Sequence, residues 1–540
     1  MHAEPDNDNW RLEMNDLYKK LGVHIPEILL PADGTDLTKW AVIACDQYTS
    51  QPEYWDGVQR EVGQEPSTFK LTFPEIYLKD DDKDERIANI NKTMEQYLNQ
   101  GILEKQTPGF ILVERSTPHT ASRKGLMLAL DLECYDYRPG AQTLIRATEG
   151  TVLDRIPPRV KIRENATIEL PHIMVLIDDP DRTVIESLYT KAEAGSFKKL
   201  YDFELMQGGG HIKGWKVDDE ESLSMVARAL DKLEHGVCSC KDDSIGDGSH
   251  ISHISHNSGG PDNSDGPDNF DGSDTSDTSD ASDASDNAGR NLLFAVGDGN
   301  HSLASAKAHW ENVKAELMKT NQADISADQN TTCAPIPEHP ARYALVEIVN
   351  VHDDGLVFEP IHRVLFNIDA ATILEKLKAA CSNQLCMDYK LYDSKEDMEQ
   401  ALETTKSATD TISSAVSGTV SAPVSATISS ASHLLPFILE GRCGILTVTN
   451  PSSNIEVGTL QSVLDELQKT DPDIEIDYIH GDAVVTELGS KPNSMGFYLP
   501  VMNKHDLFPT VRLDGVLPRK TFSMGEAEEK RYYLECRRIR

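Results

Sequence analysis

A short apolar segment that leads through a glycine turn into an amphipathic helix constrains the fold more than any other feature. Residues 292–296 form an apolar run of the length of a buried strand. Gly297 and Gly299 flank Asp298, and glycines allow a tight turn with unusual backbone angles. Beyond His301, apolar residues recur at helical spacing at Leu303, Ala306, Trp310, Val313 and Leu317. The sequence therefore predicts a strand, a turn and a helix in direct succession.

This turn has the composition of an anion-binding site. The first amides of a helix have no acceptor within the helix, and with the helix dipole they attract an anion such as phosphate. The polar residues crowded at the turn are Asp298, Asn300, His301 and Ser302. The alternative is that Asp-Gly-Asn is ordinary turn composition and that a polar residue only caps the helix. Because several polar groups meet at one corner, we favour a functional site.

Composition limits the class of protein and its partners. The 540 residues carry a formal net charge of −37, which argues against nucleic acid and anionic membranes, because both require clustered Lys and Arg. No apolar segment has membrane-spanning length, and the N-terminus is acidic rather than signal-like. Nine scattered cysteines are typical of reduced thiols. We therefore expect a cytoplasmic protein with small-molecule partners, and the sequence leaves its oligomeric state open.

Two low-complexity inserts interrupt the chain. Residues 241–289 are rich in Ser, Asp, Gly and Asn and cannot bury enough apolar surface to offset the entropy of ordering, so we predict disorder. Residues 404–432 are rich in Ser, Thr, Ala and Val. The alternatives are a weak helix or strand and a surface loop, and low complexity favours the surface loop. The remainder divides into an N-terminal α/β region, residues 1–240, and a C-terminal α/β region, residues 290–540, which contains the turn.

The secondary-structure pattern is mixed. Apolar runs bounded by Gly, Pro or Asp predict strands at residues 109–114, 125–131, 172–177 and 444–448. Helical periodicity predicts helices at residues 84–100, 220–234, 371–380 and 460–469. We also predict a hairpin of residues 343–350 and 356–359, joined around Asp353-Asp-Gly355. Because strands and helices do not alternate regularly, the predicted fold class is α+β with a mixed sheet.

A second glycine cluster, Gln207-Gly-Gly-Gly-His-Ile-Lys213, has two interpretations. Three glycines let the backbone approach a ligand closely, and His211 and Lys213 can meet an anion. The alternative, which spacing alone favours, is a hairpin bend between strands at residues 200–206 and 212–217.

Further cationic and acidic residues are candidates for substrate binding. Residues 146–163 are rich in Arg, including Arg155, which suggests an anion pocket or else a solvated loop that balances nearby carboxylates. His362 and Arg363 follow a proline at the end of a strand. The guanidinium group of Arg363 suits a substrate carboxylate or a phosphate. The alternative is a surface ion pair for Arg363 and a packed side chain for His362. Asp46 follows an apolar strand and has two interpretations. In the first it binds a substrate amine or a metal, and in the second it only closes an Asx-turn.

The turn resembles known phosphate-binding motifs. Val296-Gly-Asp-Gly-Asn-His-Ser-Leu-Ala-Ser-Ala-Lys307 resembles the Asp-Gly-His-His-Arg signature of the ParB/sulfiredoxin superfamily, whose members bind nucleotide phosphates there. It is more similar still to a large bacterial family known as domain of unknown function one thousand and fifteen. Other stretches similar to that family are residues 40–50, 207–213, 359–363 and 518–525. Where the superfamily motif has a first His and an Arg, this chain has Asn300 and Ser302, so a bidentate phosphate contact is missing.

The superfamily includes free-serine kinases, and the resemblance implies an amino-acid biosynthetic kinase that makes O-phosphoserine from free L-serine with Mg²⁺. The donor is pyrophosphate or a nucleotide, and the missing Arg favours the compact pyrophosphate. Two rival functions are a phosphoserine phosphatase and a non-catalytic, nucleotide-responsive binding module.

Residues are assigned to this activity by the resemblance and by their chemistry. The predicted donor-phosphate site consists of Gly297, Gly299, Asn300, His301 and Ser302, with His211 and Lys213 from the second glycine cluster. Asp298 is the predicted Mg²⁺ ligand, and either Asp298 or Glu149 accepts the hydroxyl proton. The predicted substrate-binding residues are Asp46, Arg155, His362 and Arg363.

Overall fold

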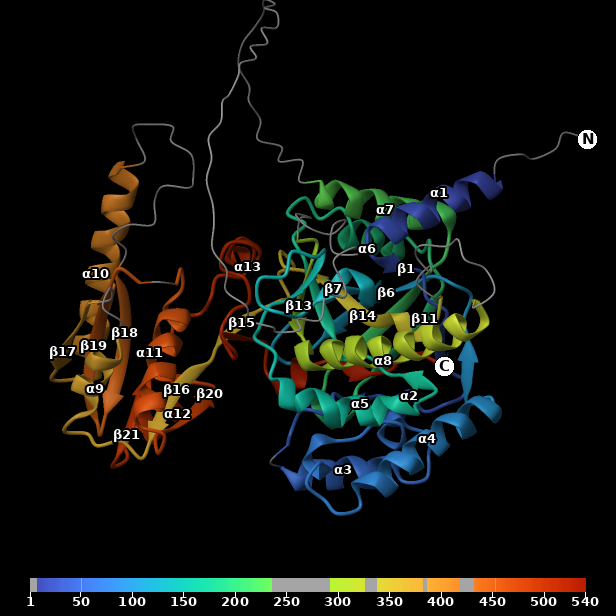
Figure 1. The fold of residues 1–540 in the computed structure, drawn as a ribbon. Helices are drawn as coiled ribbons and strands as arrows, with labels where there is room; N and C mark the ends of the chain where they lie inside the picture. Colours follow the sequence, from blue (N-terminus) through green and yellow to red (C-terminus); the bar gives the residue numbers. More distant parts are fainter. Residues whose placement is uncertain are drawn as a thin grey trace, which may run out of the picture.

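The computed structural model describes residues 7–49, 51–235, 292–325, 338–381, 386–416, 432–451 and 453–540. These residues form a larger unit on a ten-stranded mixed sheet and a smaller unit on a six-stranded antiparallel sheet, which lie side by side (Figure 1). The predicted α+β class is therefore confirmed. The first insert, residues 241–289, lies outside the described residues.

The ten-stranded sheet combines strands from both sides of the first insert. Its order is β11 (Lys199–Glu204), β12 (His211–Val217), β5 (Phe110–Ser116), β6 (Arg123–Asp131), β14 (Tyr343–Asn350), β10 (Met174–Ile177), β13 (Phe294–Asp298), β8 (Ile145–Ala147) and β7 (Tyr135–Asp136), and β1 (Val23–His24) pairs with β6. Strands β13 and β14 follow the insert but lie among earlier strands, so residues 1–240 and 290–540 both contribute to this sheet.

Helical layers cover both faces of this sheet (Figure 1). Because side chains alternate across a strand, Leu126 and Leu128 of β6 enter one core and Met127 enters another. The first core contains side chains of α1 (Asn7–Lys20), α6 (Ile185–Glu193), α7 (Glu220–Glu234) and α8 (Asn300–Ile325). The second contains side chains of α2 (Leu37–Trp40), α3 (Pro52–Val62) and α4 (Lys83–Asn99). Burial on both faces explains why the central strands are continuously apolar.

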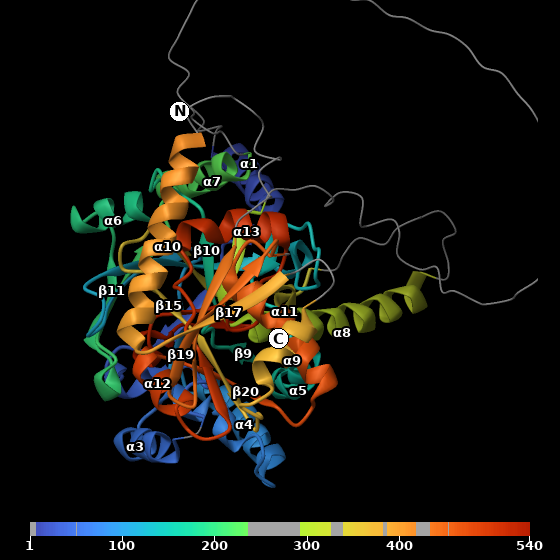
Figure 2. The same cartoon turned by 90° about the vertical axis from the view of Figure 1, so that its left-hand side faces the viewer.

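The smaller unit has its own sheet and two helical faces (Figure 2). The strand order is β17 (Cys386–Tyr392), β19 (Arg442–Thr449), β18 (His433–Leu439), β21 (Ser494–Phe497), β16 (His362–Phe366) and β20 (Glu475–Ile479). One face packs against α9 (Ile373–Ala380) and α11 (Glu456–Thr470), and the other against α10 (Lys395–Val416) and α12 (Asp482–Gly489). Because α10 continues to Val416, the surface loop predicted for residues 404–432 is wrong for its first part, and residues 417–431 lie outside the described residues.

The predicted hairpin of residues 343–350 and 356–359 is wrong. Strand β14 pairs with β6 and β10, whereas β15 (Phe358–Pro360) pairs with β22 (Phe522–Met524). Seven of the eight side chains of β14 are buried, which is typical of a central strand whose two edges are already occupied. The Asp353-Asp-Gly355 turn therefore ends one sheet instead of closing a hairpin.

The segment after residue 520 returns to the N-terminal part of the chain. Beyond β22, β23 (Tyr532–Tyr533) pairs with β3 (Val42–Ile43). The last strand, β24 (Cys536–Arg538), lies between β2 (Ile28–Pro31) and β9 (Ile168–Glu169) in a four-stranded sheet with β4 (Leu103–Lys105). Helix α13 (Leu507–Asp514), which precedes this segment, lies between the two units (Figure 1).

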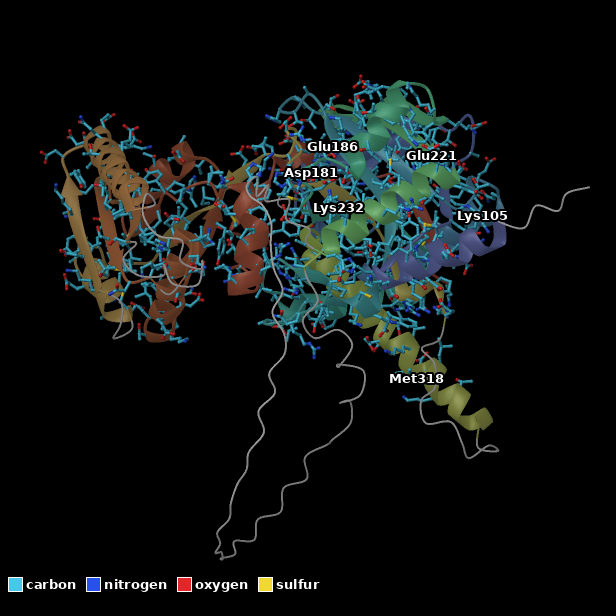
Figure 3. The ribbon with its side chains drawn as sticks, turned by 90° about the horizontal axis from the view of Figure 1, so that it is seen from above. Lys105, Asp181, Glu186, Glu221, Lys232 and Met318 are labelled. Atoms are coloured by element: carbon cyan, nitrogen blue, oxygen red, sulfur yellow. The ribbon has the colours of Figure 1, made fainter. Side chains whose placement is uncertain are left out.

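Helix α8 is anchored beyond its midpoint and projects only at its end. Trp310 is fully buried and Leu317 still packs against the first core, whereas the last part of the helix, around Met318, projects from the body of the molecule (Figures 2 and 3). Exposed ion pairs lie on the surface of the larger unit, such as Lys232 of α7 with Asp181, 3.2 Å apart (Figure 3). Among the helices of the described residues, none combines the length and apolarity needed to cross a membrane.

Candidate active site

The predicted strand, turn and helix are present: β13 ends at Asp298 and α8 begins at Asn300. Gly299 has φ +82°, and a Cβ built there would lie 3.0 Å from Ile173 Cγ1. A Cβ on Gly297 would lie 2.7 Å from Met524 Sδ. One glycine therefore supplies a left-handed backbone and the other allows the C-terminal segment to approach the turn.

The backbone at the helix start suits an anion. Ser302 N and Leu303 N both donate to Gly299 O, at 2.9 and 3.0 Å. The amides of Asn300 and His301 precede these bonds, so they have no acceptor within the helix. The helix dipole adds positive potential at the same place.

Two of the polar side chains at the turn have structural bonds of their own. Asn300 is buried, its Oδ1 accepts from Thr148 N at 3.2 Å, and its Nδ2 donates to Val296 O at 3.2 Å. His301 Nε2 accepts from Val152 N at 3.1 Å, which leaves the ring proton on Nδ1. Burial first, and then the nearby Arg159 and Arg155, lower the pKa of His301 to about 4. His301 is therefore neutral near neutral pH and offers phosphate a hydrogen bond rather than a charge.

Asp298 forms an ion pair with a lysine from the C-terminal segment. Its Oδ2 lies 3.3 Å from Lys530 Nζ, and its Oδ1 accepts from Gly299 N at 2.9 Å. Lys530 also donates to Ser523 Oγ at 3.1 Å and to Met524 O at 3.2 Å. The ammonium group is thereby fixed beside the start of α8.

Glu149 follows β8 and lies near the same group of charges. Burial raises the pKa of Glu149, and so does the neighbouring Asp298, while Lys520 and its backbone amide act in the opposite direction. The net effect is a carboxyl group whose pKa is above its ordinary value, which is the environment expected of a proton acceptor that works near neutral pH.

Asp46 and His172 form the other side of the site. Asp46 Oδ2 lies 3.9 Å from His172 Nε2. Burial raises the pKa of Asp46, but His172, a hydrogen bond from Gln47 and the charge of Lys530 outweigh it and lower the pKa overall. Asp46 is therefore ionised beside the Asp298–Lys530 pair.

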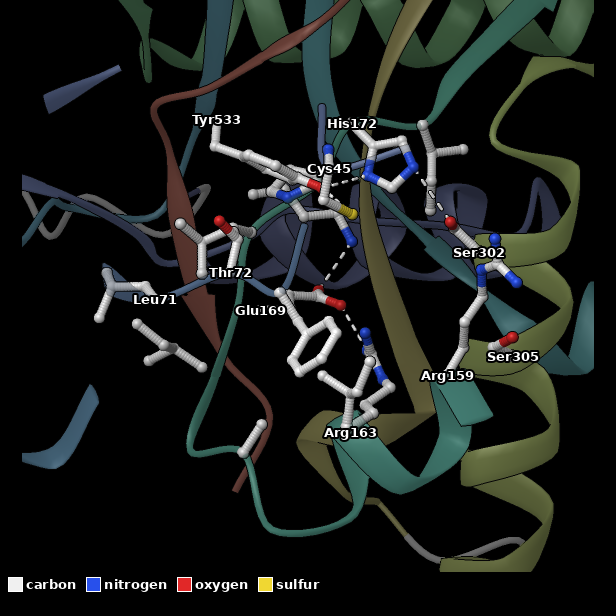
Figure 4. Close-up of a pocket in the computed structure, with 18 of the residues that line it drawn as sticks. Cys45, Leu71, Thr72, Arg159, Arg163, Glu169, His172, Ser302, Ser305 and Tyr533 are labelled. Carbon is white, nitrogen blue, oxygen red and sulfur yellow. Dashed lines mark hydrogen bonds and ion pairs between the residues drawn. The ribbon is translucent and has the colours of Figure 1, made fainter. Parts of the chain in front are cut away.

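A cavity of about 150 Å³ adjoins this group (Figure 4). Its walls are mostly apolar and include Leu71, Phe73, Met94, Ile162, Ile168 and Leu170. His172, Ser302 and Tyr533 lie along one wall, and the ion pair of Arg159 with Glu75 lines it as well. The first turn of α8 thus borders both a charged cluster and a mostly apolar cavity.

His211 and Lys213 are not brought to the turn. The hairpin alternative is confirmed for this segment, because β11 and β12 pair in antiparallel fashion around it. Four strands of the sheet separate β12 from β13. His211 bonds Asp202 and Glu204 at 2.6 and 2.8 Å, and Lys213 bonds Glu114 at 3.0 Å.

His362 and Arg363 belong to the smaller sheet. His362 Nδ1 accepts from Leu499 N at 3.0 Å, and its Nε2 lies 2.9 Å from Asp482 Oδ1. Arg363 is fully buried and donates to Lys520 O at 2.9 Å and to Arg519 O at 3.2 Å. Burial lowers the pKa of Arg363 to about 10. The surface ion-pair alternative is therefore wrong for Arg363. Its bonds instead hold the backbone of Lys520, whose amide forms a hydrogen bond with Glu149.

The Arg363→Lys variant should lose stability without a selective loss of serine affinity. A lysine retains the charge but cannot donate to several carbonyl groups from one plane. We expect the free energy of unfolding to fall by about 2 kcal/mol or more, since hydrogen bonds from a buried charged group are lost. Urea denaturation and steady-state kinetics with each substrate varied would measure this. A raised KM for serine alone, at unchanged stability, would instead support a direct contact with the serine carboxylate.

Comparison with known proteins identifies the family. Residues 29–467 match the family described as "Protein of unknown function (DUF1015)". The chain belongs to this family. The resemblance noted from the motifs is thereby confirmed, and no curated protein matches the chain.

Solved structures show only distant likenesses to this DUF1015 protein. A conserved hypothetical protein from Pyrococcus furiosus is 16% identical, with a TM-score of 0.24 and coverage of 45% of this chain and 71% of that one. A free serine kinase variant in complex with AMP is 14% identical, with a TM-score of 0.26 and the same coverage. A complex of such a variant with ADP has 14% identity, a TM-score of 0.25 and coverage of 45% and 72%. Likenesses this distant say nothing about the chemistry of the site.

Three residues of the DUF1015 site were not predicted: His172, Lys530 and Tyr533. Each lies far in sequence from the turn and in a segment with no motif of its own. Lys530 stands in an ordinary charged stretch, and His172 precedes a buried strand, so neither has a local signal. Arg155 is exposed at the edge of the site, where its charge contributes to lowering the pKa of His301.

Proposed function

We propose that this protein is a phosphotransferase that moves a phosphoryl group from pyrophosphate or a nucleotide to the hydroxyl group of free L-serine. The observation that carries the proposal is the meeting of carboxylates and cations at the first turn of α8. These groups come from distant parts of the chain: Asp46, Glu149, Asp298, Lys520 and Lys530. Phosphoryl transfer depends on such a combination, because its catalysis consists mainly of positioning and charge stabilisation.

The donor phosphate would occupy the start of α8. Backbone amides of Asn300 and His301 are directed there, and the Nδ1–H of His301 is an additional donor. The ammonium of Lys530 is close to the same turn, since it pairs with Asp298. Together these groups offset phosphate charge without the arginine of the superfamily motif.

The carboxylate oxygens of Asp298 fit Mg²⁺, which proteins bind through one or two carboxylates together with substrate phosphates. The grouping of three potential metal ligands found among the described residues is Asp231, Glu234 and His235 at the C-terminal end of α7, not this turn. The site therefore fits a Mg²⁺ ion that arrives with the donor rather than one held in a protein cage. Such an ion supplies charge neutralisation on the donor phosphates.

The acceptor would be bound between Asp46 and Glu149. Asp46 is ionised and can pair with an ammonium group, and Arg155 at the exposed edge can pair with a carboxylate. Glu149 is the better proton acceptor, since its raised pKa lies closer to the working pH, whereas Asp298 is already paired with Lys530. Asp298 then orients Lys530 and the donor.

The direct test is to incubate the purified full-length protein with L-serine, Mg²⁺ and, in separate reactions, pyrophosphate, ATP or ADP, and to detect O-phosphoserine by mass spectrometry. A product with any donor supports the proposal. Release of phosphate from O-phosphoserine alone would favour the phosphatase. Tight nucleotide binding with no turnover of serine would favour the binding module.

The pH dependence should identify Glu149 as the base. A base must be ionised to act, so kcat/KM falls as the pH drops through the pKa of the base. Because the pKa of Glu149 is raised, this decline should occur above the ordinary range of a glutamate. We expect Glu149→Gln to lower kcat by about 100-fold and to abolish that limb of the profile.

A matched control is Glu53→Gln, on the exposed side of α3, which should retain the wild-type profile. An acid limb with the same midpoint in Glu149→Gln would assign the proton to another group.

A further inference from the structure

Ser302 Oγ lies 3.0 Å from His172 Nε2, at the wall of the apolar cavity (Figure 4). A serine hydroxyl becomes a nucleophile when a neighbouring base removes its proton. Whether His172 can do so depends on which ring nitrogen carries hydrogen. The surrounding hydrogen bonds decide this.

The bonds of Tyr533 fix the proton of His172 on Nδ1. Tyr533 donates its hydroxyl hydrogen to Cys45 Sγ at 3.0 Å, so its oxygen is free to accept. The oxygen accepts from Cys45 N at 3.2 Å and lies 2.9 Å from His172 Nδ1. His172 Nδ1–H is therefore the donor to Tyr533. In the neutral ring Nε2 keeps a lone pair, whereas the protonated ring, which lowers the pKa of Asp46, has none. That lone pair faces Ser302 Oγ.

The protein around Ser302 suits a phosphorylated serine. Ser302 lies in the first turn of α8, where a phosphate group is stabilised by unpaired amides and the helix dipole. The Arg159 side chain, from helix α5 (Ile156–Glu164), points toward Ser302 (Figure 4). Helix α5 packs against α8, so this arginine is held in place. Arg159 forms an ion pair with Glu75, which lines the same cavity.

We propose that Ser302 is a covalent nucleophile that carries the phosphoryl group between donor and acceptor. This inference rests on the proposed function. In the first step Ser302 Oγ attacks the terminal phosphorus of the donor, its proton passes to His172 Nε2, and the bridging P–O bond breaks to release orthophosphate or the shortened nucleotide. In the second step the serine hydroxyl attacks phosphorus, its proton passes to Glu149, the P–Oγ bond breaks, and Oγ recovers its proton from His172.

The apolar cavity has a function in this scheme. Water that reached the phosphorylated Ser302 would hydrolyse it and waste the donor. The walls beside Ser302 are mostly hydrocarbon, so they disfavour an ordered water there. The enzyme would therefore keep the intermediate until an acceptor enters from the charged side.

The test is acceptor-free labelling. The full-length protein is mixed with Mg²⁺ and pyrophosphate, ATP or ADP in the absence of serine, quenched in acid and analysed by intact mass and peptide mapping. We expect one added phosphoryl group, located on Ser302. In Ser302→Ala the adduct should disappear and O-phosphoserine formation should fall by about 100-fold or more. In His172→Gln the adduct should form much more slowly.

Ser305→Ala is the matched control. Ser305 lines the same cavity one turn further along α8, and its Oγ donates to His301 O at 2.7 Å. This variant should retain the adduct and the activity.

The outcomes separate this inference from the proposed function. An adduct on Ser302 with no O-phosphoserine would support the nucleophile and overturn the serine acceptor. O-phosphoserine made at the wild-type rate by Ser302→Ala, with no adduct in the wild type, would overturn the nucleophile and retain the transferase. A second readout is exchange without serine of the labelled leaving group into its donor: orthophosphate into pyrophosphate, ADP into ATP, or AMP into ADP. The two-step route requires this exchange with whichever donor is used, and direct transfer forbids it.

Discussion

Replacing Asp298 by asparagine is expected to lower O-phosphoserine formation by about 100-fold or more at nearly unchanged stability. Asn can keep the bond to Gly299 N through its side-chain oxygen, so the turn should persist. It cannot provide the negative charge that fixes Lys530, 3.3 Å away, or bind a donor-borne Mg²⁺. Steady-state kinetics and a urea denaturation curve on the same preparation would measure both expectations.

Asp136→Asn is the control for this change. Asp136 is also a paired aspartate in the larger unit, but its partner is the exposed Arg138 and it lies on the edge strand β7. This variant should turn over at the wild-type rate. Wild-type kinetics in Asp298→Asn itself would remove Asp298 from the mechanism.

The largest loss of stability is expected from Arg531→Met. Arg531 is almost completely buried and pairs with two carboxylates, Glu347 at 2.7 Å and Glu535. Removing one partner of a buried ion pair leaves an uncompensated charge, which costs about 3–5 kcal/mol. Here two buried carboxylates would lose their arginine. Thermal and chemical denaturation should both show this loss.

Arg138→Met provides the comparison, since the side chain of Arg138 is 80% exposed. An exposed ion pair contributes at most about 1 kcal/mol, so its loss should barely shift the unfolding midpoint. If both variants unfolded at the same denaturant concentration, the buried charges would not stabilise the fold as described. Activity should follow stability in Arg531→Met, because Lys530 and Tyr533 lie on the same segment.

Local sequence patterns were sufficient for most elements but not for their pairing. The helix predicted at residues 220–234 matches α7, and the run at residues 125–131 lies within β6. Periodicity and apolar runs report whether a segment is buried, which is a local property. The partner of a strand is not local. Residues 343–350 read as one arm of a hairpin, yet both edges of β14 are filled by strands from earlier in the chain.

The site shows the same limit. The turn at Asp298 carries its own signal, because glycines and polar side chains are concentrated in a few residues. His172 and Lys530 gain their roles only through tertiary contacts, with Ser302 and Asp298 respectively. Conversely, His211 and Lys213 have the right chemistry, but the sheet order leaves four strands between β12 and β13. The residue types indicated which side chains could belong to the site, and the order of the strands determined which of them lie at the turn.

The hydrogen-bonded path from Ser302 through His172 and Tyr533 to Cys45 has a consequence for how activity is acquired in time. His172 and Tyr533 are 361 positions apart in the chain, and Cys45 and Tyr533 are 488 apart. Closing such long loops is slow, and contacts of high sequence separation form late in folding. During refolding, helix content should therefore return before catalytic competence does. The molecule would pass through a stage in which most of its helices are formed while Ser302 still lacks its base.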